Sequence, residues 1–354
     1  MNDGLPRSGG RTSRIADVVD RTLECAVVPS FTRIGYDVRS RLGHWTPISE
    51  FDLSGRVVVI TGATSGLGLS AAQALLAAGA SVEIIGRDPA RTAAVSERLR
   101  VENPAGELGF LVADTGDLDA VRNVCDTLAD RHGAIDALIH NAGALDKEYA
   151  LSPQGLERTV ASQVAGPFAM TALLLPLLRA GSGSRVVWVS SGGLYTQPLS
   201  VAALDGGPGS YRGAVAYARA KRAQVTLAQM WAEHLRRDRV RVHAMHPGWA
   251  DTPGLRTSLP TFRRVLRPAL RSPAQGVDTL VWLAADDGLP LHTTGLFWLD
   301  RRPRPIHRLS STRRTDTADE RARLWSWCVR HAGIDHFETG GSRLDGTGLR
   351  RPRR

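Results

Sequence analysis

Cysteine, lysine and long apolar segments are all scarce in this chain, and each shortage narrows what the protein can be. The 354 residues include three cysteines, Cys25, Cys125 and Cys328, with neither a Cys-x-x-Cys pair nor the spacing of a zinc site. This pattern argues against a disulfide framework and against a structural metal. No stretch comes near the roughly twenty uncharged apolar residues of a membrane span, and the first thirty residues lack the pattern of a signal peptide. We therefore expect a cytoplasmic protein that binds no metal.

Lysine occurs twice, at Lys147 and Lys221, whereas the other 43 of the 45 basic residues are arginine. A lysine here indicates a task that a planar guanidinium cannot perform. Lys221 lies four residues after Tyr217, a spacing that places both side chains on one face of a helix. An ammonium beside a phenol favours the phenolate and lowers the phenol's pKa from about 10, which suits a general acid or base near neutral pH. Taken alone the pattern is weak, because a solvated helix face also produces it.

The net charge of +10 lies largely in arginine clusters outside the expected core. No recognisable nucleic-acid-binding module accompanies these clusters, so we expect no specific nucleic-acid partner. We expect a solvated surface, with at most a weak attraction to acidic lipid headgroups. The clusters are Arg263-Arg264, Arg301-Arg302, Arg313-Arg314 and the tail Arg350-Arg351-Pro352-Arg353-Arg354.

A glycine-rich segment from Thr61 to Gly68 separates two runs of different character. Residues 57–60 are Val-Val-Val-Ile, typical of a buried parallel strand, and residues 69–79 read as an Ala/Leu-rich helix that ends in Gly. Such a turn lets the backbone approach a dinucleotide pyrophosphate, and the helix N-terminus offers unpaired N–H groups. The spacing is Gly-x-x-x-Gly-x-Gly and not the common Gly-x-Gly-x-x-Gly, so a glycine-rich turn without a ligand remains the alternative.

Short apolar strands alternate with helices between residues 51 and 300. The alternation predicts the α/β class: a single Rossmann-type, doubly wound parallel sheet with helices on both faces. Around this NAD(P)-binding catalytic domain (51–300) we expect a partly disordered N-terminal extension (1–50), a C-terminal helical extension (301–337) with a helix at 317–331, and a disordered basic tail (338–354). About seven strands are expected, at 56–61, 81–86, 108–113, 135–140, 185–190, 240–245 and 295–299.

Three further segments complete a pattern in which the chain resembles the short-chain dehydrogenase/reductase family. Asn141-Ala142-Gly143 follows a strand, residues 186–193 form a serine-bearing strand end, and residues 245–252 hold a Pro-Gly segment. Five ordered motifs over about two hundred residues rarely coincide by chance. The retinol-dehydrogenase-like branch is the most similar, over roughly residues 30 to 335. The resemblance implies an NAD(P)-dependent oxidoreductase that interconverts a carbonyl and an alcohol.

The resemblance also implies catalytic roles. Tyr217 would exchange a proton with the substrate oxygen, Lys221 would lower the Tyr217 pKa and hold the nicotinamide ribose, and Ser191 would stabilise that oxygen. Ser191 occupies the family's serine position, and strand alternation points Ser190 the other way. Gln163 stands where the family commonly has an Asn that supports a water-linked proton relay. The relay can survive on the longer amide with altered geometry, or it can be lost.

Cofactor choice depends on the second strand, which ends in Gly86 and is followed by Arg87. An NAD site usually has an acidic residue at this strand end, whereas a guanidinium can pair with a 2′-phosphate. We therefore favour NADP(H), and the adjacent Asp88 keeps NAD(H) open. Asp114 fits an adenine contact or a helix N-cap equally well, and Thr252 would contact the nicotinamide amide. The residues implied in cofactor binding are Gly62, Thr64, Ser65, Gly66, Leu67, Gly68, Arg87, Asp114, Asn141, Ala142, Gly143, Tyr217, Lys221, Pro247, Gly248 and Thr252.

The substrate is the least specified part of the prediction. Apolar residues recur at helical spacing after Thr252, where the family keeps its substrate-closing loop, and either a packed surface helix or a lid fits them. Family analogy favours a lipophilic ketone, aldehyde or alcohol. A catalytically idle NADP(H) sensor and a peripheral membrane scaffold are the alternatives, and a homo-oligomer is compatible with the family. The recurring residues are Leu255, Leu259, Phe262 and Leu266.

Overall fold

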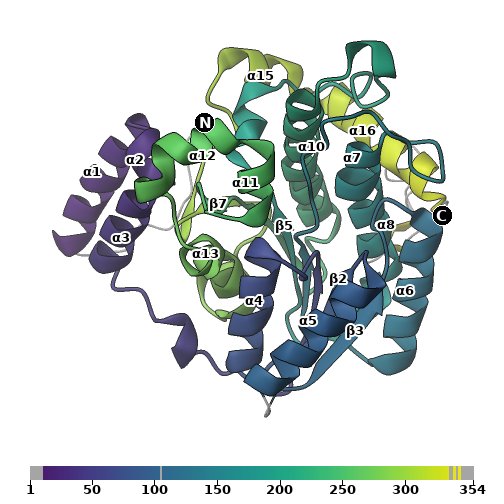
Figure 1. The fold of residues 1–354 in the computed structure, drawn as a ribbon, viewed down its shortest axis with the longest axis horizontal. Helices are drawn as coiled ribbons and strands as arrows, with labels where there is room; N and C mark the ends of the chain where they lie inside the picture. The colour runs from purple at the N-terminus through teal and green to yellow at the C-terminus, as the bar shows by residue number, and fades with distance from the viewer. Residues whose placement is uncertain (1–10, 104–105, 335–337, 340–341, 344–354) are drawn as a thin grey trace.

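The structure is a computed structural model that describes residues 11–103, 106–334, 338–339 and 342–343. A sheet lies at its centre (Figure 1). The sheet has eight strands in the order β3-β2-β1-β4-β5-β6-β7-β8. Neighbouring strands pair in parallel except for β7 and β8, which are antiparallel. The strands are β1 (Val57–Thr61), β2 (Ser81–Gly86), β3 (Leu108–Val112), β4 (Ala137–His140), β5 (Arg185–Val189), β6 (Arg241–Met245), β7 (Phe297–Leu299) and β8 (Arg302–Pro303).

The predicted α/β class and doubly wound sheet are confirmed, and each of the seven predicted strands is present. β8 is additional: it is two residues long, and its Arg-Pro sequence has none of the apolar character that signals a strand. Proline lacks the N–H that an interior strand would donate, which suits it to the edge position that β8 occupies.

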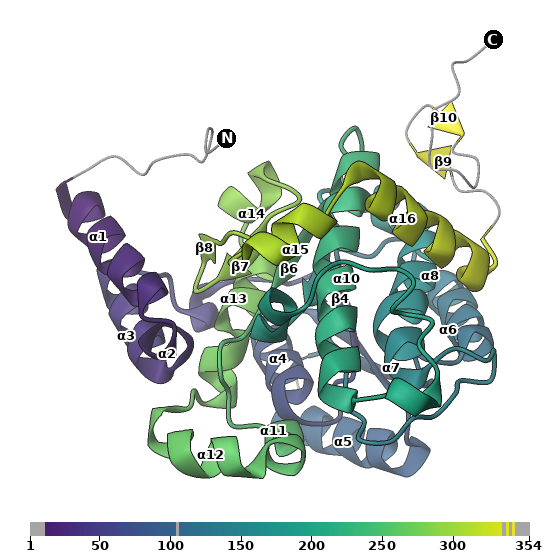
Figure 2. The same cartoon turned by 90° about the horizontal axis from the view of Figure 1, so that it is seen from above.

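Helices cover both faces of the sheet (Figures 1 and 2). The buried residues of α4, α5 and α13 belong to one core cluster and those of α6, α8, α10 and α16 to the other. Strand β1 serves both, because Val58 and Ile60 join the first cluster and Val59 the second, as a two-residue period requires. The helices from the sheet onward are α4 (Gly66–Ala77), α5 (Pro89–Glu102), α6 (Leu118–Arg131), α7 (Arg158–Val160), α8 (Gly166–Leu173), α9 (Leu175–Ala180), α10 (Gly213–His234), α11 (Pro253–Ser258), α12 (Pro260–Leu266), α13 (Pro273–Ala285), α14 (Leu289–His292), α15 (Ser310–Thr315) and α16 (Ala318–Ala332), with a π-helical turn η2 (Ala161–Ala165) between α7 and α8.

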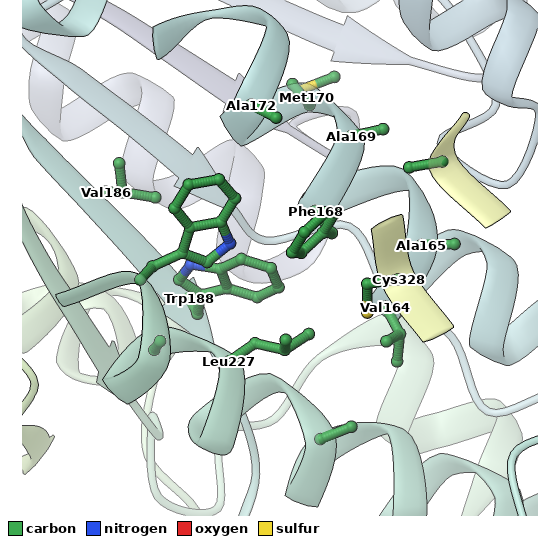
Figure 3. Packing of buried hydrophobic residues seen from close by; sticks show 14 of the residues in the cluster. Val164, Ala165, Phe168, Ala169, Met170, Ala172, Val186, Trp188, Leu227 and Cys328 are labelled. Carbon is green, nitrogen blue, oxygen red and sulfur yellow. The ribbon is translucent and has the colours of Figure 1, made fainter. Parts of the chain in front are cut away.

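The helix predicted at 317–331 is α16, and it is part of the core. Thr317 caps its first turn by accepting a hydrogen bond from the Glu320 N–H (3.2 Å), and a left-handed Gly333 ends it. Its Trp325 ring packs 5.0 Å, centroid to centroid, from Phe168 of α8. Figure 3 shows Phe168 among its apolar neighbours, with Cys328 beside Val164.

The N-terminal extension forms three helices, α1 (Arg11–Cys25), α2 (Val28–Phe31) and α3 (Arg33–Leu42), grouped at one side of the sheet (Figures 1 and 2). Buried ion pairs attach them to the rest of the fold. The Asp300 carboxylate, 1% exposed, accepts hydrogen bonds from Arg39 of α3 (2.7 Å) and from Arg271 (2.8 Å). Residues 1–10 and most of the predicted tail from 338 lie outside the described residues. The described part of the tail is an antiparallel strand pair, β9 (Glu338–Thr339) and β10 (Ser342–Arg343).

The arginines at 301 and 302 are not the solvated cluster that the sequence suggested. Arg301 is 9% exposed and donates to the Asp278 carboxylate (2.7 Å), while Arg302 pairs with Asp17 of α1 (2.7 Å). Both charges are therefore used to join segments of the fold. Within the described ranges, no helix is both long and apolar enough to cross a bilayer, and no group of three or more His, Cys, Asp or Glu side chains is placed to hold a metal ion.

Candidate active site

The glycine-rich segment forms a tight turn between β1 and α4. Gly62 has a φ of 69°, in the left-handed region that favours glycine. A Cβ on Gly68 would lie 2.3 Å from the Gly62 carbonyl oxygen and 2.4 Å from Asn141 Nδ2, so a larger residue cannot fit there. Ser65 precedes α4 in an extended conformation and makes no side-chain cap, so it leaves the N–H groups of the first turn available. This cradle fits a dinucleotide pyrophosphate.

Asn141 and Thr61 tie the end of β4 to the end of β1. The Asn141 side-chain amide donates to the carbonyl oxygens of Thr61 (3.0 Å) and Gly62 (3.2 Å). In return, the Thr61 hydroxyl accepts hydrogen bonds from the N–H groups of Asn141 (3.1 Å) and Ala142 (3.0 Å). Asn141 therefore holds the start of the glycine-rich turn through its side-chain amide. Thr61 was not among the predicted site residues, although its place at a strand end before the glycines was a usable signal.

Two adjacent serines at the end of β5 point to different partners. The Ser190 hydroxyl is buried and donates to the backbone carbonyl of Lys221 (3.0 Å). The Ser191 side chain lies close enough to the Tyr217 phenol to lower its pKa, and the Ser191 hydroxyl accepts a hydrogen bond from the Gly193 N–H (3.3 Å). Ser191 and Tyr217 thus lie together, from β5 and from α10.

The two other tyrosines near this site are engaged elsewhere. The Tyr195 hydroxyl donates to the Pro305 carbonyl (2.9 Å), and the Tyr211 hydroxyl donates to the Asp146 carbonyl (3.2 Å). Neither phenol has a lysine one turn away in the sequence. The geometry therefore leaves Tyr217 as the phenol suited to proton exchange here.

Lys221 is 3% exposed and lies with its Nζ 5.2 Å from the centre of the Tyr217 ring. Its ammonium donates to the Val189 carbonyl (2.9 Å) and to Gln224 Oε1 (3.0 Å). Burial lowers the pKa of Lys221 to about 7. Burial also raises the pKa of Tyr217, although the neighbouring Ser191 side chain opposes this. The net shift of the Tyr217 pKa is therefore upward, because burial disfavours the phenolate, and the lowering expected from Lys221 stays a prediction.

Gln163 reaches this site from the π-helical turn η2. Its side-chain Nε2 donates to the Ala144 carbonyl (2.8 Å), while its Oε1 is buried with no hydrogen-bond partner among the described residues. Its backbone carbonyl accepts a hydrogen bond from Gln224 Nε2 (2.8 Å). A Cβ on Gly143 would lie 3.0 Å from Gln163 Oε1 and 3.2 Å from Lys221 Nζ, so the strand-end Gly143 lies between them.

The Pro-Gly segment returns to the glycine-rich turn. A Cβ on Gly66 would lie 3.4 Å from Thr252 Cβ, so the two loops are in contact. The Thr252 hydroxyl caps α11 by accepting a hydrogen bond from the Leu255 N–H (3.2 Å). Gly248 has a φ of 71°, and the Pro247 carbonyl accepts a hydrogen bond from Arg271 (3.3 Å). Arg271 thus holds this loop to the buried Asp300, a link that the sequence did not reveal.

At the other end of the cradle, the acidic residues are used for local structure. The Asp88 carboxylate caps α5 by accepting from the Arg91 N–H (2.9 Å), and the Arg91 side chain donates to the Thr64 carbonyl (3.3 Å). Arg87 is exposed directly after β2. Asp114 accepts a hydrogen bond from the Gly116 N–H (2.8 Å). Asp117 caps α6 instead, so the helix N-cap interpretation of Asp114 is wrong.

An aromatic cluster with edge-to-face ring contacts lies on the other side of the Pro-Gly segment. The Trp249 ring contacts Phe31 of α2 (centroids 5.5 Å apart) and Phe262 of α12 (5.0 Å), and the Trp249 N–H donates to the Phe31 carbonyl (2.7 Å). Phe31 is the partner that sequence reasoning missed, because it lies more than two hundred residues earlier. The helical run after Thr252 is two helices, since Pro260 ends the pattern at Leu259.

The family model for short chain dehydrogenases matches residues 56–261. The chain belongs to the short-chain dehydrogenase family. Human dehydrogenase/reductase SDR family member 12 is 32% identical over 291 residues, which cover 82% of this chain and 90% of the human protein. The putative daunorubicin C-13 ketoreductase DnrU of Streptomyces sp. (strain C5) is 36% identical over 265 residues (74% of this chain, 88% of that protein). A short chain dehydrogenase of Escherichia coli CFT073, solved in complex with NADPH, has a TM-score of 0.59 and 25% identity over 72% of this chain and 100% of its own.

This short-chain dehydrogenase is therefore an oxidoreductase that uses a nicotinamide cofactor. The residues present fit such a cofactor, because Gly68 leaves room that a Cβ would fill and the α4 N-terminus presents its first-turn N–H groups. Gly62 to Gly68 and Thr252 would hold its phosphates and nicotinamide end.

Proposed function

We propose that this dehydrogenase interconverts a carbonyl and an alcohol on a lipophilic small molecule, with NADP(H) as the cofactor. The observation that carries the proposal is that Ser191 lies next to the Tyr217 phenol and a buried Lys221, at the carboxyl ends of the strands, where the glycine-rich turn also lies. A bound NADP(H) supplies or accepts the hydride. Everything else in the chemistry falls to side chains of this chain.

Each side chain has a distinct part in the proposed reduction. The Ser191 hydroxyl donates to the substrate oxygen, and this contact strengthens as negative charge develops there, which is typically worth about 3 kcal/mol in the transition state. Tyr217 gives its phenolic proton to the same oxygen. The Lys221 ammonium, 5.2 Å from the ring centre, stabilises the phenolate that remains. Oxidation of the alcohol uses the same groups in reverse.

Arginines around the β2 end support NADP(H) as the cofactor. Arg87 is exposed there, and Arg91 reaches the Thr64 carbonyl in the glycine-rich turn, so two guanidinium groups flank the place where a 2′-phosphate would lie. Asp88, the residue that kept NAD(H) open, uses its carboxylate to cap α5. The Escherichia coli relative was solved with NADPH.

A lipophilic substrate is supported by the aromatic cluster of Phe31, Trp249 and Phe262 at the Pro-Gly segment. The name of the Streptomyces relative is compatible with a ketone substrate, since it gives a putative ketoreductase that acts at C-13 of daunorubicin. Arg263 of α12 donates to Asp251 (2.8 Å), which would anchor α12 as a lid over such a substrate.

The test is oxidation of NADPH at 340 nm with a panel of lipophilic aldehydes and ketones, with NADH in parallel. Tyr217→Phe should lower kcat at least about a hundredfold, because it removes the general acid, and should keep NADPH binding. Turnover that survives Tyr217→Phe would overturn the assignment of the acid. Tight NADPH binding without turnover on the panel would favour the sensor, and turnover with NADH alone would overturn the choice of NADP(H).

A further inference from the structure

Gln224 lies one turn after Lys221 in α10 and is fully buried. Its Oε1 accepts a hydrogen bond from Lys221 Nζ (3.0 Å), and its Nε2 donates to the backbone carbonyl of Gln163 (2.8 Å). The orientation of the amide follows from chemistry, since an ammonium can only donate and a carbonyl can only accept. Gln224 is thus held between Lys221 and the π-helical turn.

The Gln163 carbonyl is available to Gln224 because of the residue four positions later. Pro167 has no N–H and so cannot provide the α-helical hydrogen bond to this carbonyl. The local backbone forms the π-helical turn η2 instead. The Gln163 side chain is directed to the Ala144 carbonyl, so it is the backbone of Gln163, through Gln224, that is connected to Lys221.

Among the described residues, no charged group offsets the burial of Lys221. The described residues that approach it from β5, from the end of β4 and from η2 are uncharged, and its titratable neighbour is Tyr217 of its own helix. The ammonium therefore depends on two neutral acceptors, the Val189 carbonyl and Gln224 Oε1. A lysine buried with few acceptors loses its proton easily.

We propose that Gln224 is a positioning residue for Lys221: its amide keeps the ammonium charged and directs it toward Tyr217. At neutral pH an amide has no proton to pass on, so the connection from Lys221 through Gln224 to Gln163 is electrostatic support and not a proton relay. The effect on turnover rests on the proposed function, whereas the effect on the charge of Lys221 does not.

The scarcity of lysine makes a direct test practical. In protein labelled with ¹⁵N and ¹³C at lysine, Lys147→Arg removes the other lysine signal, and the pKa of Lys221 can then be titrated by NMR in the full chain. Gln224→Met keeps the size of the side chain and removes the acceptor. Because a hydrogen bond to a charged group is typically worth one pH unit or more in pKa, we expect the Lys221 pKa to fall by about one unit. Gln224→Glu replaces the neutral acceptor with a carboxylate, so the same pKa should rise.

Thr226→Val is the matched control. Thr226 is equally buried in α10, and its hydroxyl donates to the Arg222 carbonyl (3.2 Å) without touching Lys221. This variant should leave the Lys221 pKa unchanged. A Lys221 pKa that is the same in wild type, Gln224→Met and Gln224→Glu would overturn the proposal, and so would a fall of the same size in Thr226→Val.

The rate profile separates this proposal from the proposed function. If Lys221 loses its charge more easily, Tyr217 becomes less acidic, so the pH midpoint of alcohol oxidation in Gln224→Met should move upward, with KM for the nucleotide changed less than kcat. A shifted Lys221 pKa in a protein without turnover would remove the proposed function and leave the role of Gln224 standing. Normal turnover of Gln224→Met with an unshifted Lys221 pKa would overturn the proposed role of Gln224 and leave the proposed function standing.

Discussion

The hydroxyl of Ser190 donates to the backbone carbonyl of Lys221, 3.0 Å away, across the gap between β5 and α10. The side chain of its neighbour Ser191 lies next to the Tyr217 phenol instead. Two consecutive serines therefore have separate partners: Ser190 holds the helix that carries Tyr217 and Lys221, and Ser191 faces the phenol that we propose as the general acid.

This division predicts different outcomes for two small substitutions. Ser191→Ala should lower kcat about a hundredfold, because it removes a donor to the developing charge, and should leave the unfolding free energy nearly unchanged. Ser190→Ala should cost about 1 kcal/mol of stability through the lost buried hydrogen bond, with kcat within a few-fold of wild type. Steady-state kinetics and urea unfolding of both variants check the pair. Equal kinetic losses would contradict the division.

Cofactor preference should depend on the arginines around the β2 end. Arg87→Leu and Arg91→Leu should each raise KM for NADPH about tenfold or more, because each removes a charged donor to the 2′-phosphate. KM for NADH should stay nearly unchanged, since NADH lacks that phosphate. Parallel titrations with both nucleotides make the comparison, and Asp88→Asn, which alters only the α5 cap, serves as the control. Equal changes for both nucleotides would count against NADP(H).

Three buried histidines predict that stability falls in mild acid. Burial lowers the pKa values of His140, His243 and His246 to about 3, 4 and 3. Below the unfolded value of about 6.5 the unfolded chain binds protons that the folded chain refuses, so the unfolding free energy drops as the pH falls. We expect a loss of about 3 kcal/mol between pH 6.5 and pH 5.5 for the three together, measured by urea unfolding.

The histidines can be separated by substitution. His140→Asn should remove about a third of the pH-dependent loss, because one of three equivalent groups is gone. The exposed His44 provides the comparison, and His44→Asn should leave the pH dependence as it is. A slope that ignores His140→Asn would show that other groups cause the acid sensitivity.

The sheet could be predicted from the sequence because its strands are continuous apolar runs. The strand at 57–61 holds a continuous apolar run, the helix after it is rich in Ala and Leu, and the glycines mark the turn between them. β8 could not be predicted, since two residues carry no periodic signal. The helix expected after Thr252 is divided because Pro260 ends it, a signal that was present but outweighed by the spacing of the leucines.

The arrangement of the candidate site was predictable where it follows a motif and not where it depends on distant contacts. Ser191, Tyr217 and Lys221 come together as their motif predicts, and Ser190 turns away as strand alternation requires. The contact of Phe31 with Trp249 joins segments that no local pattern relates. The electrostatics also escaped prediction, because the burial that raises the Tyr217 pKa is a property of the assembled fold.

The attachment of α2 to the Pro-Gly segment has a consequence for how the protein is made. Arg271 donates to the Phe31 carbonyl across 240 residues of chain, and Trp249 reaches the same carbonyl. During synthesis the N-terminal helices leave the ribosome first, yet their partners Trp249 and Arg271 emerge only when most of the chain is complete. Contacts between such distant segments form late and slowly. We therefore expect nascent chains to form the glycine-rich turn first. The contacts of α2 with the Pro-Gly segment should form last, although α2 is among the first helices to be synthesised.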